Sequence, residues 1–109
     1  MPAADALVVV STTVASAGDA DRLATLLVEE RLAACVQVTG PLRSTYRWRA
    51  VVEQTDEWAL AIKTTAAALP ALEARLAAEH PYELPEIVAV EVRHASAGYA
   101  AWVREAVAP

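Results

Sequence analysis

The sequence predicts an α+β fold of the ferredoxin-like type, a four-stranded antiparallel sheet with helices on one face. The segments expected to be strands are short apolar runs or alternating patterns, and apolar residues recur at helical spacing in the segments expected to be helices. These segments follow the order strand, helix, strand, strand, helix, strand, helix, which is a split β-α-β pattern. The 109 residues fit one domain that spans positions 1–109.

The start of the chain predicts a buried strand followed by a helix. Leu7–Val10 is a short β-branched run that ends at Ser11, and the turn-prone residues 16–19 follow it. Helical spacing runs from Asp19 to Ala34, and the acidic Asp19 suits the positive N-terminus of this helix. The apolar side of the helix consists of Leu23, Leu26, Leu27 and Ala34.

A long β-hairpin is predicted next. Its first strand begins at Val36–Val38, and Gly40–Pro41 is expected to bend or bulge this strand because proline cannot donate to a ladder. A tight turn near Arg49–Ala50 leads to a further strand that includes residues 58–63. Alternation gives the hairpin one face lined by arginine. The two faces carry Ser44, Tyr46 and Trp48 on one side, and Arg43, Thr45, Arg47 and Arg49 on the other.

The second half of the chain predicts two helices and one strand. Helical spacing covers Thr64–Ala78, with Pro70 placed in the first turn. Ile87–Val92 is an apolar run typical of a strand, and Tyr99–Val107 predicts a short last helix. The apolar side of the helix predicted over Thr64–Ala78 consists of Leu69, Leu72 and Leu76.

Charge and composition exclude several classes of protein. A net charge of −5 and a pI of about 4.9 disfavour nucleic-acid binding, which needs a concentrated basic face. The single cysteine, Cys35, indicates a reducing compartment. Signal-peptide features and membrane-length apolar runs are missing, so we expect a cytoplasmic protein without membrane association. The 26 alanines leave a modest core, which favours burial of further surface against copies of the same chain.

The most informative segment is His80–Ile87, which holds an imidazole, a phenol and two carboxylates around two prolines. Each proline fixes its own backbone and biases the preceding residue toward extended geometry. The segment is therefore a stiff connector with its polar groups held in place, which is how sites are often built. The alternative is a polar corner between a helix and a strand.

Four ordered motifs, together with Tyr99 and Trp102, resemble the CutA divalent-cation-tolerance family. The motifs are residues 30–36 (ERLAACV), 44–48 (STYRW), 62–65 (IKTT) and 80–87 (HPYELPEI). The resemblance runs from about Val8 to Val103, with matching spacing. It implies a ferredoxin-like protomer in a tight homotrimer, similar to the PII signalling proteins, with the sheets packed around a three-fold axis by the long hairpins. The family name reflects a link to copper and other divalent metals, and no settled activity comes with it.

Three residues are candidate metal ligands. His80 follows a helix, and neutral imidazole suits copper or zinc. Glu79 precedes it where some relatives carry a second histidine, and the Cys35 thiolate would favour soft copper. The alternatives are a histidine that stabilises a helix end and a cysteine that acts as a small buried hydrophobe. Ser11 stands where some copper-linked relatives carry a cysteine, which weakens the metal hypothesis.

The family resemblance implies that a second group of residues approaches a cleft between neighbouring subunits. It consists of Lys63, Glu86, Tyr82, Trp48 and Tyr46. A lysine with nearby arginines is suited to an anionic metabolite, as in PII-like proteins. The alternative is an interface ion pair that only stabilises the trimer.

The function predicted from sequence is metal tolerance by a cytoplasmic homotrimer that binds copper or another divalent metal. The two alternatives are a PII-like regulator that binds a small anion, and a trimeric scaffold without a ligand. An enzyme is not expected, because no nucleophile motif or triad is present. Departures from the family pattern occur at Ser11, at Arg49–Ala50 and in the loop Val14–Gly18.

Overall fold

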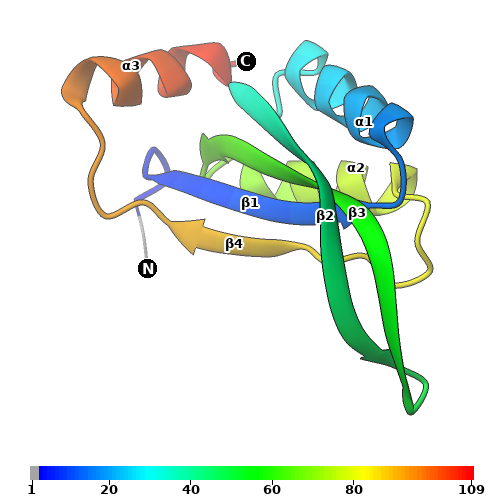
Figure 1. Cartoon of the computed structure of the whole chain (residues 1–109). Coiled ribbons are helices and arrows are strands. Elements are labelled where there is room, and N and C mark those ends of the chain that lie inside the picture. The colour runs from blue at the N-terminus through cyan, green and yellow to red at the C-terminus, as the bar shows by residue number, and fades with distance from the viewer. Residues whose placement is uncertain (1–2) are drawn as a thin grey trace.

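The structure is a computed structural model that describes residues 3–109. Its elements are β1 (Leu7–Val14), α1 (Ala17–Glu29), β2 (Cys35–Trp48), β3 (Val51–Thr65), α2 (Leu69–Glu79), β4 (Val88–Glu91) and α3 (Ala97–Ala106). The four strands form one antiparallel sheet in the order β2-β3-β1-β4, as the split β-α-β prediction requires. Helices α1 and α2 lie on one face of the sheet, and the β2–β3 hairpin projects well beyond it (Figure 1). The predicted ferredoxin-like α+β fold is confirmed.

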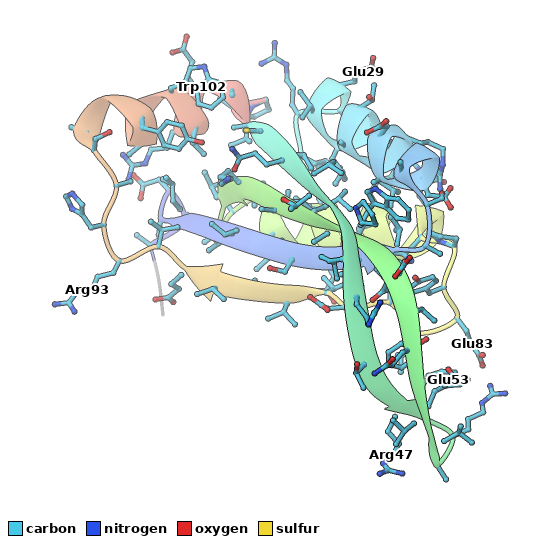
Figure 2. All side chains as sticks on the ribbon, viewed as in Figure 1. Glu29, Arg47, Glu53, Glu83, Arg93 and Trp102 are labelled. Carbon is cyan, nitrogen blue, oxygen red and sulfur yellow. The ribbon has the colours of Figure 1, made fainter. Side chains whose placement is uncertain are left out.

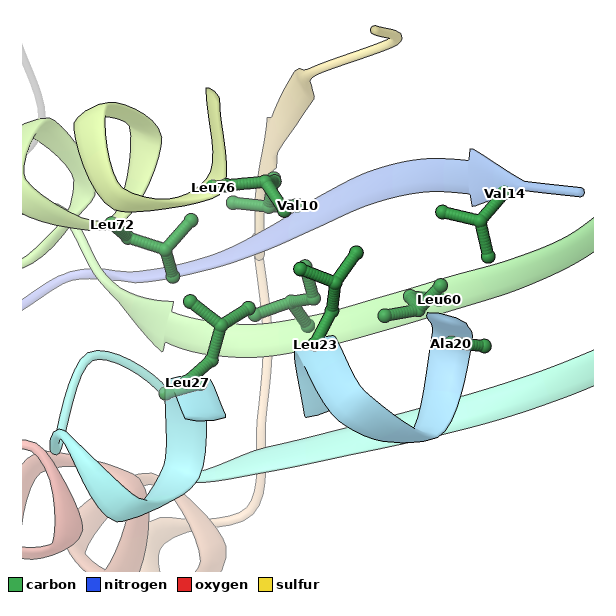
Figure 3. Packing of buried hydrophobic residues seen from close by; sticks show 10 residues of the cluster. Val10, Val14, Ala20, Leu23, Leu27, Leu60, Leu72 and Leu76 are labelled. Atoms are coloured by element: carbon green, nitrogen blue, oxygen red, sulfur yellow. The ribbon is translucent and has the colours of Figure 1, made fainter. Parts of the chain in front are cut away.

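The main core lies between the sheet and helices α1 and α2. Alternate residues of β1 are buried, which is the pattern of a strand covered on one face. Figure 3 shows leucines of the two helices meeting side chains of β1 and β3 in this layer. Each fully buried leucine or valine contributes about 1.5 to 3 kcal/mol relative to an exposed one. The cluster includes Val10, Val14, Leu23, Leu27, Leu60, Ile62, Leu72 and Leu76.

Helix α3 packs separately, through Ala100 and Val103, in a smaller buried cluster that includes Leu7 and Ala34. It therefore covers one end of the sheet rather than the main core. Among residues 3–109, no helix is long and apolar enough to cross a membrane.

Several boundaries differ from those predicted. Strand β1 continues past Ser11 to Val14, because the polar residues 11–13 also pair with β3. Helix α1 ends at Glu29, and Arg31 adopts a positive φ of 58° that turns the chain toward the sheet. The predicted helix from Thr64 begins only at Leu69, because Thr64 still pairs with β1.

The hairpin contains the irregularity expected at Gly40–Pro41. Thr39 pairs with Ala59 and Leu42 pairs with Glu57, so β2 advances three residues where β3 advances two. This extra residue is a β-bulge, and it exchanges the faces on which odd and even residues of β2 project. The distal part of β2 therefore has its even-numbered side chains on the side of Glu57.

Candidate functional site

A cleft of about 820 Å³ lies between the part of the β2–β3 hairpin beyond the bulge and the loop that joins α2 to β4. We call it the hairpin cleft. It is lined by Thr13, Ser44, Thr45, Tyr46, Trp48, Glu53, Glu57, Pro81, Tyr82, Glu83, Leu84, Pro85 and Glu86. The volume falls in the range of about 300–1,000 Å³ that is typical of small-molecule sites.

The hairpin cleft combines carboxylates with aromatic rings. Four glutamates and three aromatic side chains line it, and its described lining includes no lysine, arginine or histidine. Figure 2 shows Glu53 and Glu83 on the side of the hairpin that faces the loop, and Arg47 on the opposite side. The cleft is therefore suited to cations.

The bulge explains why the cleft is acidic and aromatic. Beyond the bulge, Tyr46 pairs with Glu53 and Trp48 with Val51, which places these side chains on the Glu57 side of the hairpin. The arginines of β2 occupy the alternate positions and project to the other face. The register agrees with the predicted alternation for Tyr46, Trp48, Arg43 and Arg47. Arg49 departs from it, because it lies in the turn and its guanidinium bonds to Glu83 of the cleft, and Thr45 also lines the cleft.

Tyr82 and Glu57 connect the two walls of the cleft. The Tyr82 hydroxyl donates a hydrogen bond of 2.6 Å to Glu57 Oε2, and the Glu57 residue is only 7% exposed. Burial raises the pKa of the Glu57 carboxyl, but hydrogen bonds from neighbouring hydroxyls and the nearby His80 lower it by more. Those hydroxyls belong to Ser44, Tyr82 and Thr13. Glu57 is thus a buried carboxylate that stays ionised at neutral pH.

His80 holds the start of the loop against the sheet. It ends helix α2, and its Nδ1 accepts a hydrogen bond of 3.1 Å from the Tyr82 backbone N–H. The ring proton must then be on Nε2, which donates to the Thr13 carbonyl oxygen at 3.0 Å and also lies 3.0 Å from Thr12 Oγ1. Both ring nitrogens are therefore engaged within the chain.

The environment of His80 favours the neutral ring. Burial lowers the pKa of His80, and Arg22 lowers it further. The Thr13 carbonyl, Asp19 and Glu57 oppose this shift, but the net pKa stays below its usual value. The structure therefore displays the interactions of a histidine that fastens the end of a helix to a strand.

The three residues predicted as metal ligands do not form a cluster. Glu79 accepts hydrogen bonds from Arg22 at 3.3 Å and from Arg75 at 3.0 Å, within a network that joins α1 and α2. Cys35 is half-buried at the start of β2, where it pairs with Lys63. Within residues 3–109, no group of three histidine, cysteine, aspartate or glutamate side chains is arranged to hold a metal ion.

The residues predicted near a cleft divide into two groups. Tyr46, Trp48, Tyr82 and Glu86 line the hairpin cleft, whereas Lys63 is not part of its lining. Lys63 instead donates a hydrogen bond to the Gln37 side chain on the face of the sheet opposite α1 and α2. No basic residue thus joins the four predicted residues in the cleft.

Sequence reasoning missed three of the cleft glutamates. Glu53 and Glu57 lie four residues apart on β3, opposite Tyr46 and Leu42. Glu83 belongs to the polar connector His80–Ile87. The available signal was that residues an even number of positions apart on a strand share a face, which puts Glu53 and Glu57 on one side of β3.

An arginine outside the cleft lining pairs with one of the cleft glutamates. The Arg49 guanidinium bonds to Glu83 at 2.9 Å and lies 5.1 Å from the centre of the Trp48 ring. Arg49 and Ala50 form the hairpin turn, with positive φ angles of 49° and 69°. The turn thus orients a cation toward a carboxylate and an aromatic ring at the rim of the cleft.

Fold and cleft together define a ferredoxin-like α+β protein with an acidic and aromatic cleft beside a long hairpin. Residues 8–106 match the family model described as CutA1 divalent ion tolerance protein, and the chain belongs to this family.

Individual relatives support the family membership. The chain is 46% identical over 97 residues to the divalent-cation tolerance protein CutA of Thermus thermophilus, covering 89% of this chain and 94% of that protein. The crystal structure of CutA from Xylella fastidiosa is similar, with a TM-score of 0.91, 38% identity and coverage of 94% of this chain and 98% of that one. The chloroplastic CutA protein of Arabidopsis thaliana is 34% identical over 97 residues, which are 89% of this chain and 53% of that protein. The chain thus spans about half the length of this plant relative.

Proposed function

We propose that this chain acts as a cytoplasmic homotrimer that contributes to divalent metal ion tolerance by binding the metal, without catalysis. The observation that carries the proposal is the hairpin cleft, which four carboxylates line and no described basic side chain enters. Such a cleft concentrates cations through its electrostatic field. The names of the bacterial relatives, which refer to divalent-cation tolerance, support the same function.

The trimer is supported by the face of the sheet opposite α1 and α2. Its central strands present the small residues Ser11, Ala59 and Ala61 at paired positions. At the edge, Val88 and Val90 are more than half exposed. A face of small and apolar residues permits close approach of another sheet, and copies of the same chain are the occupants that we propose.

The metal in this proposal is held mainly by carboxylates of the hairpin cleft. Glu57 stays ionised, and oxygen ligands suit hard divalent ions. One chain offers no group of three ligands within its described residues, so we propose that neighbouring subunits complete the coordination. His80 would need to give up a hydrogen bond to bind a metal, so we rank it below the glutamates as a ligand.

Two measurements test this function. Native mass spectrometry of metal-free protein should give a trimer that takes up Cu²⁺ or Mn²⁺ stoichiometrically. Titration calorimetry should show at least a tenfold loss of affinity for these ions in Glu57→Gln and Glu86→Gln. The matched control is Glu73→Gln, which changes an exposed carboxylate of α2 outside the cleft.

Each negative result has a specific meaning. A trimer that ignores both ions would contradict the metal hypothesis and favour the ligand-free scaffold. A monomer would contradict the proposed assembly. A loss of affinity in His80→Ala, with the glutamate variants unaffected, would return the metal site to the residues predicted from sequence. An anion bound through Lys63 is the less supported alternative, because Lys63 lies outside the cleft lining and the cleft itself is lined by carboxylates, which repel anions.

A further inference from the structure

Metal binding does not account for the three aromatic side chains of the hairpin cleft. Tyr46 and Trp48 line it from the hairpin, and Tyr82 lines it from the loop. A strongly hydrated divalent ion keeps much of its water, so it gains little from ring faces. We propose that the hairpin cleft binds an organic cation, namely a protonated or quaternary amine with small apolar substituents.

The charge of the cleft selects for a cation. Four carboxylates line it, and the least exposed of them, Glu57, is held in the ionised form by the hydroxyls around it. A buried carboxylate interacts more strongly with a nearby cation than an exposed one, because water screens the interaction less. The same four carboxylates would repel an anionic metabolite from the cleft.

The aromatic side chains select for an organic cation. The faces of tryptophan and tyrosine attract ammonium groups, and quaternary ammonium ligands are commonly recognised by rings of this kind. Rings also bury the methyl or methylene groups of such a ligand, as do Pro81, Leu84 and Pro85 along the loop. At about 820 Å³, the cleft has room for a small molecule rather than only an ion.

The rim of the cleft already shows this type of recognition. The guanidinium of Arg49 lies 5.1 Å from the centre of the Trp48 ring and 2.9 Å from a Glu83 carboxylate oxygen. The Arg49 side chain, which is itself an organic cation, therefore contacts one aromatic ring and one carboxylate of the cleft. The ligand that we propose repeats the same pair of contacts further inside, with Glu57 or Glu53 as the carboxylate.

Calorimetry with tetramethylammonium chloride tests the inference, with sodium chloride at equal ionic strength as the blank. We expect saturable binding to the unmodified protein and an about 2- to 30-fold loss of affinity in Trp48→Leu, the range of a cation–π contact of about 0.5 to 2 kcal/mol. Glu57→Gln should weaken binding as well. The matched control is Trp102→Leu, which changes an exposed ring on α3 outside the cleft.

The same variants separate this inference from the metal proposal. Trp48→Leu should leave Mn²⁺ affinity unchanged, whereas Glu57→Gln should lower the affinity for both ligands. Binding of tetramethylammonium without binding of metal would support the organic cation and contradict the metal function. The inference would be overturned if tetramethylammonium gave no heat beyond the salt blank, as it would if a neighbouring subunit filled the cleft. Unchanged affinity in Trp48→Leu would overturn it too.

Discussion

The Tyr82 hydroxyl donates a 2.6 Å hydrogen bond to the Glu57 carboxylate, and this bond joins the loop after α2 to strand β3. Desolvation and the neighbouring Glu57 raise the pKa of the Tyr82 phenol, so the phenol stays a donor at neutral pH. The carboxylate and its donor therefore form a stable pair, and the hairpin cleft keeps both walls in position.

Loss of this donor should destabilise the fold. In Tyr82→Phe, Glu57 stays buried with one donor fewer, so the free energy of unfolding should fall by about 1 to 3 kcal/mol. Urea unfolding at pH 7 measures the change. Tyr99→Phe, on the exposed surface of α3, is the control and should have a much smaller effect. Equal effects of the two variants would show that the hydrogen bond contributes little.

The buried His80 should make stability depend on pH. Burial lowers its pKa in the folded state, so the unfolded chain binds more protons once the pH falls below about 6.5. The free energy of unfolding should therefore decrease as the pH drops from 7 toward 5. His80→Gln should flatten this part of the profile in urea titrations. His94→Gln, in the exposed loop before α3, should retain it, and a retained slope in His80→Gln would contradict the assignment.

Gly40 is needed because Trp58 lies against it. A Cβ at position 40 would overlap the Trp58 ring, at 2.7 Å from Cγ, and would lie 3.0 Å from its backbone Cα. Gly40→Ala should therefore lower the free energy of unfolding by about 1 to 3 kcal/mol. Gly98→Ala is the contrasting variant, since nothing lies within 4 Å of its added Cβ and the position is helical. It should be neutral or stabilising by up to about 1 kcal/mol. Thermal unfolding of both variants tests the pair.

The hairpin turn is not optimal for its conformation. Ala50 has a φ of 69°, a region that costs an L-residue energy and costs glycine none. Ala50→Gly should raise the free energy of unfolding by about 0.5 to 1 kcal/mol. Ala77→Gly, at an exposed position within α2, should lower it by about 1 kcal/mol. The role of the turn would be contradicted if thermal melts showed that both variants change the free energy of unfolding in the same direction.

The order of elements was predictable from sequence because it depends on local patterns. The leucine spacing of α1 and the alternation along β2 and β3 each indicate one element and one buried face. Boundaries were less predictable where tertiary pairing overrides local preference. Ser11 resembles the end of a strand in sequence, yet it pairs with Ala61 and Val88 in the middle of the sheet.

The cleft was only partly predictable because its residues come from distant segments. Tyr82 and Glu86 were visible in the stiff connector, and Tyr46 and Trp48 in the alternating strand. Their meeting with Glu57 depends on the register of the hairpin, which no local pattern specifies. Lys63 was grouped with them because of the family resemblance, but its position on β3 places it outside the cleft lining of the single chain.

The bulge at residues 39–42 gives the hairpin an unusual sensitivity to insertion and deletion. Removal of a single residue there would turn every distal side chain of β2 to the other face without a substitution. The cleft would then receive arginines in place of Tyr46 and Trp48, and these would pair with the glutamates that line it. In this hairpin, the charge of the cleft depends on the number of residues as much as on their identity.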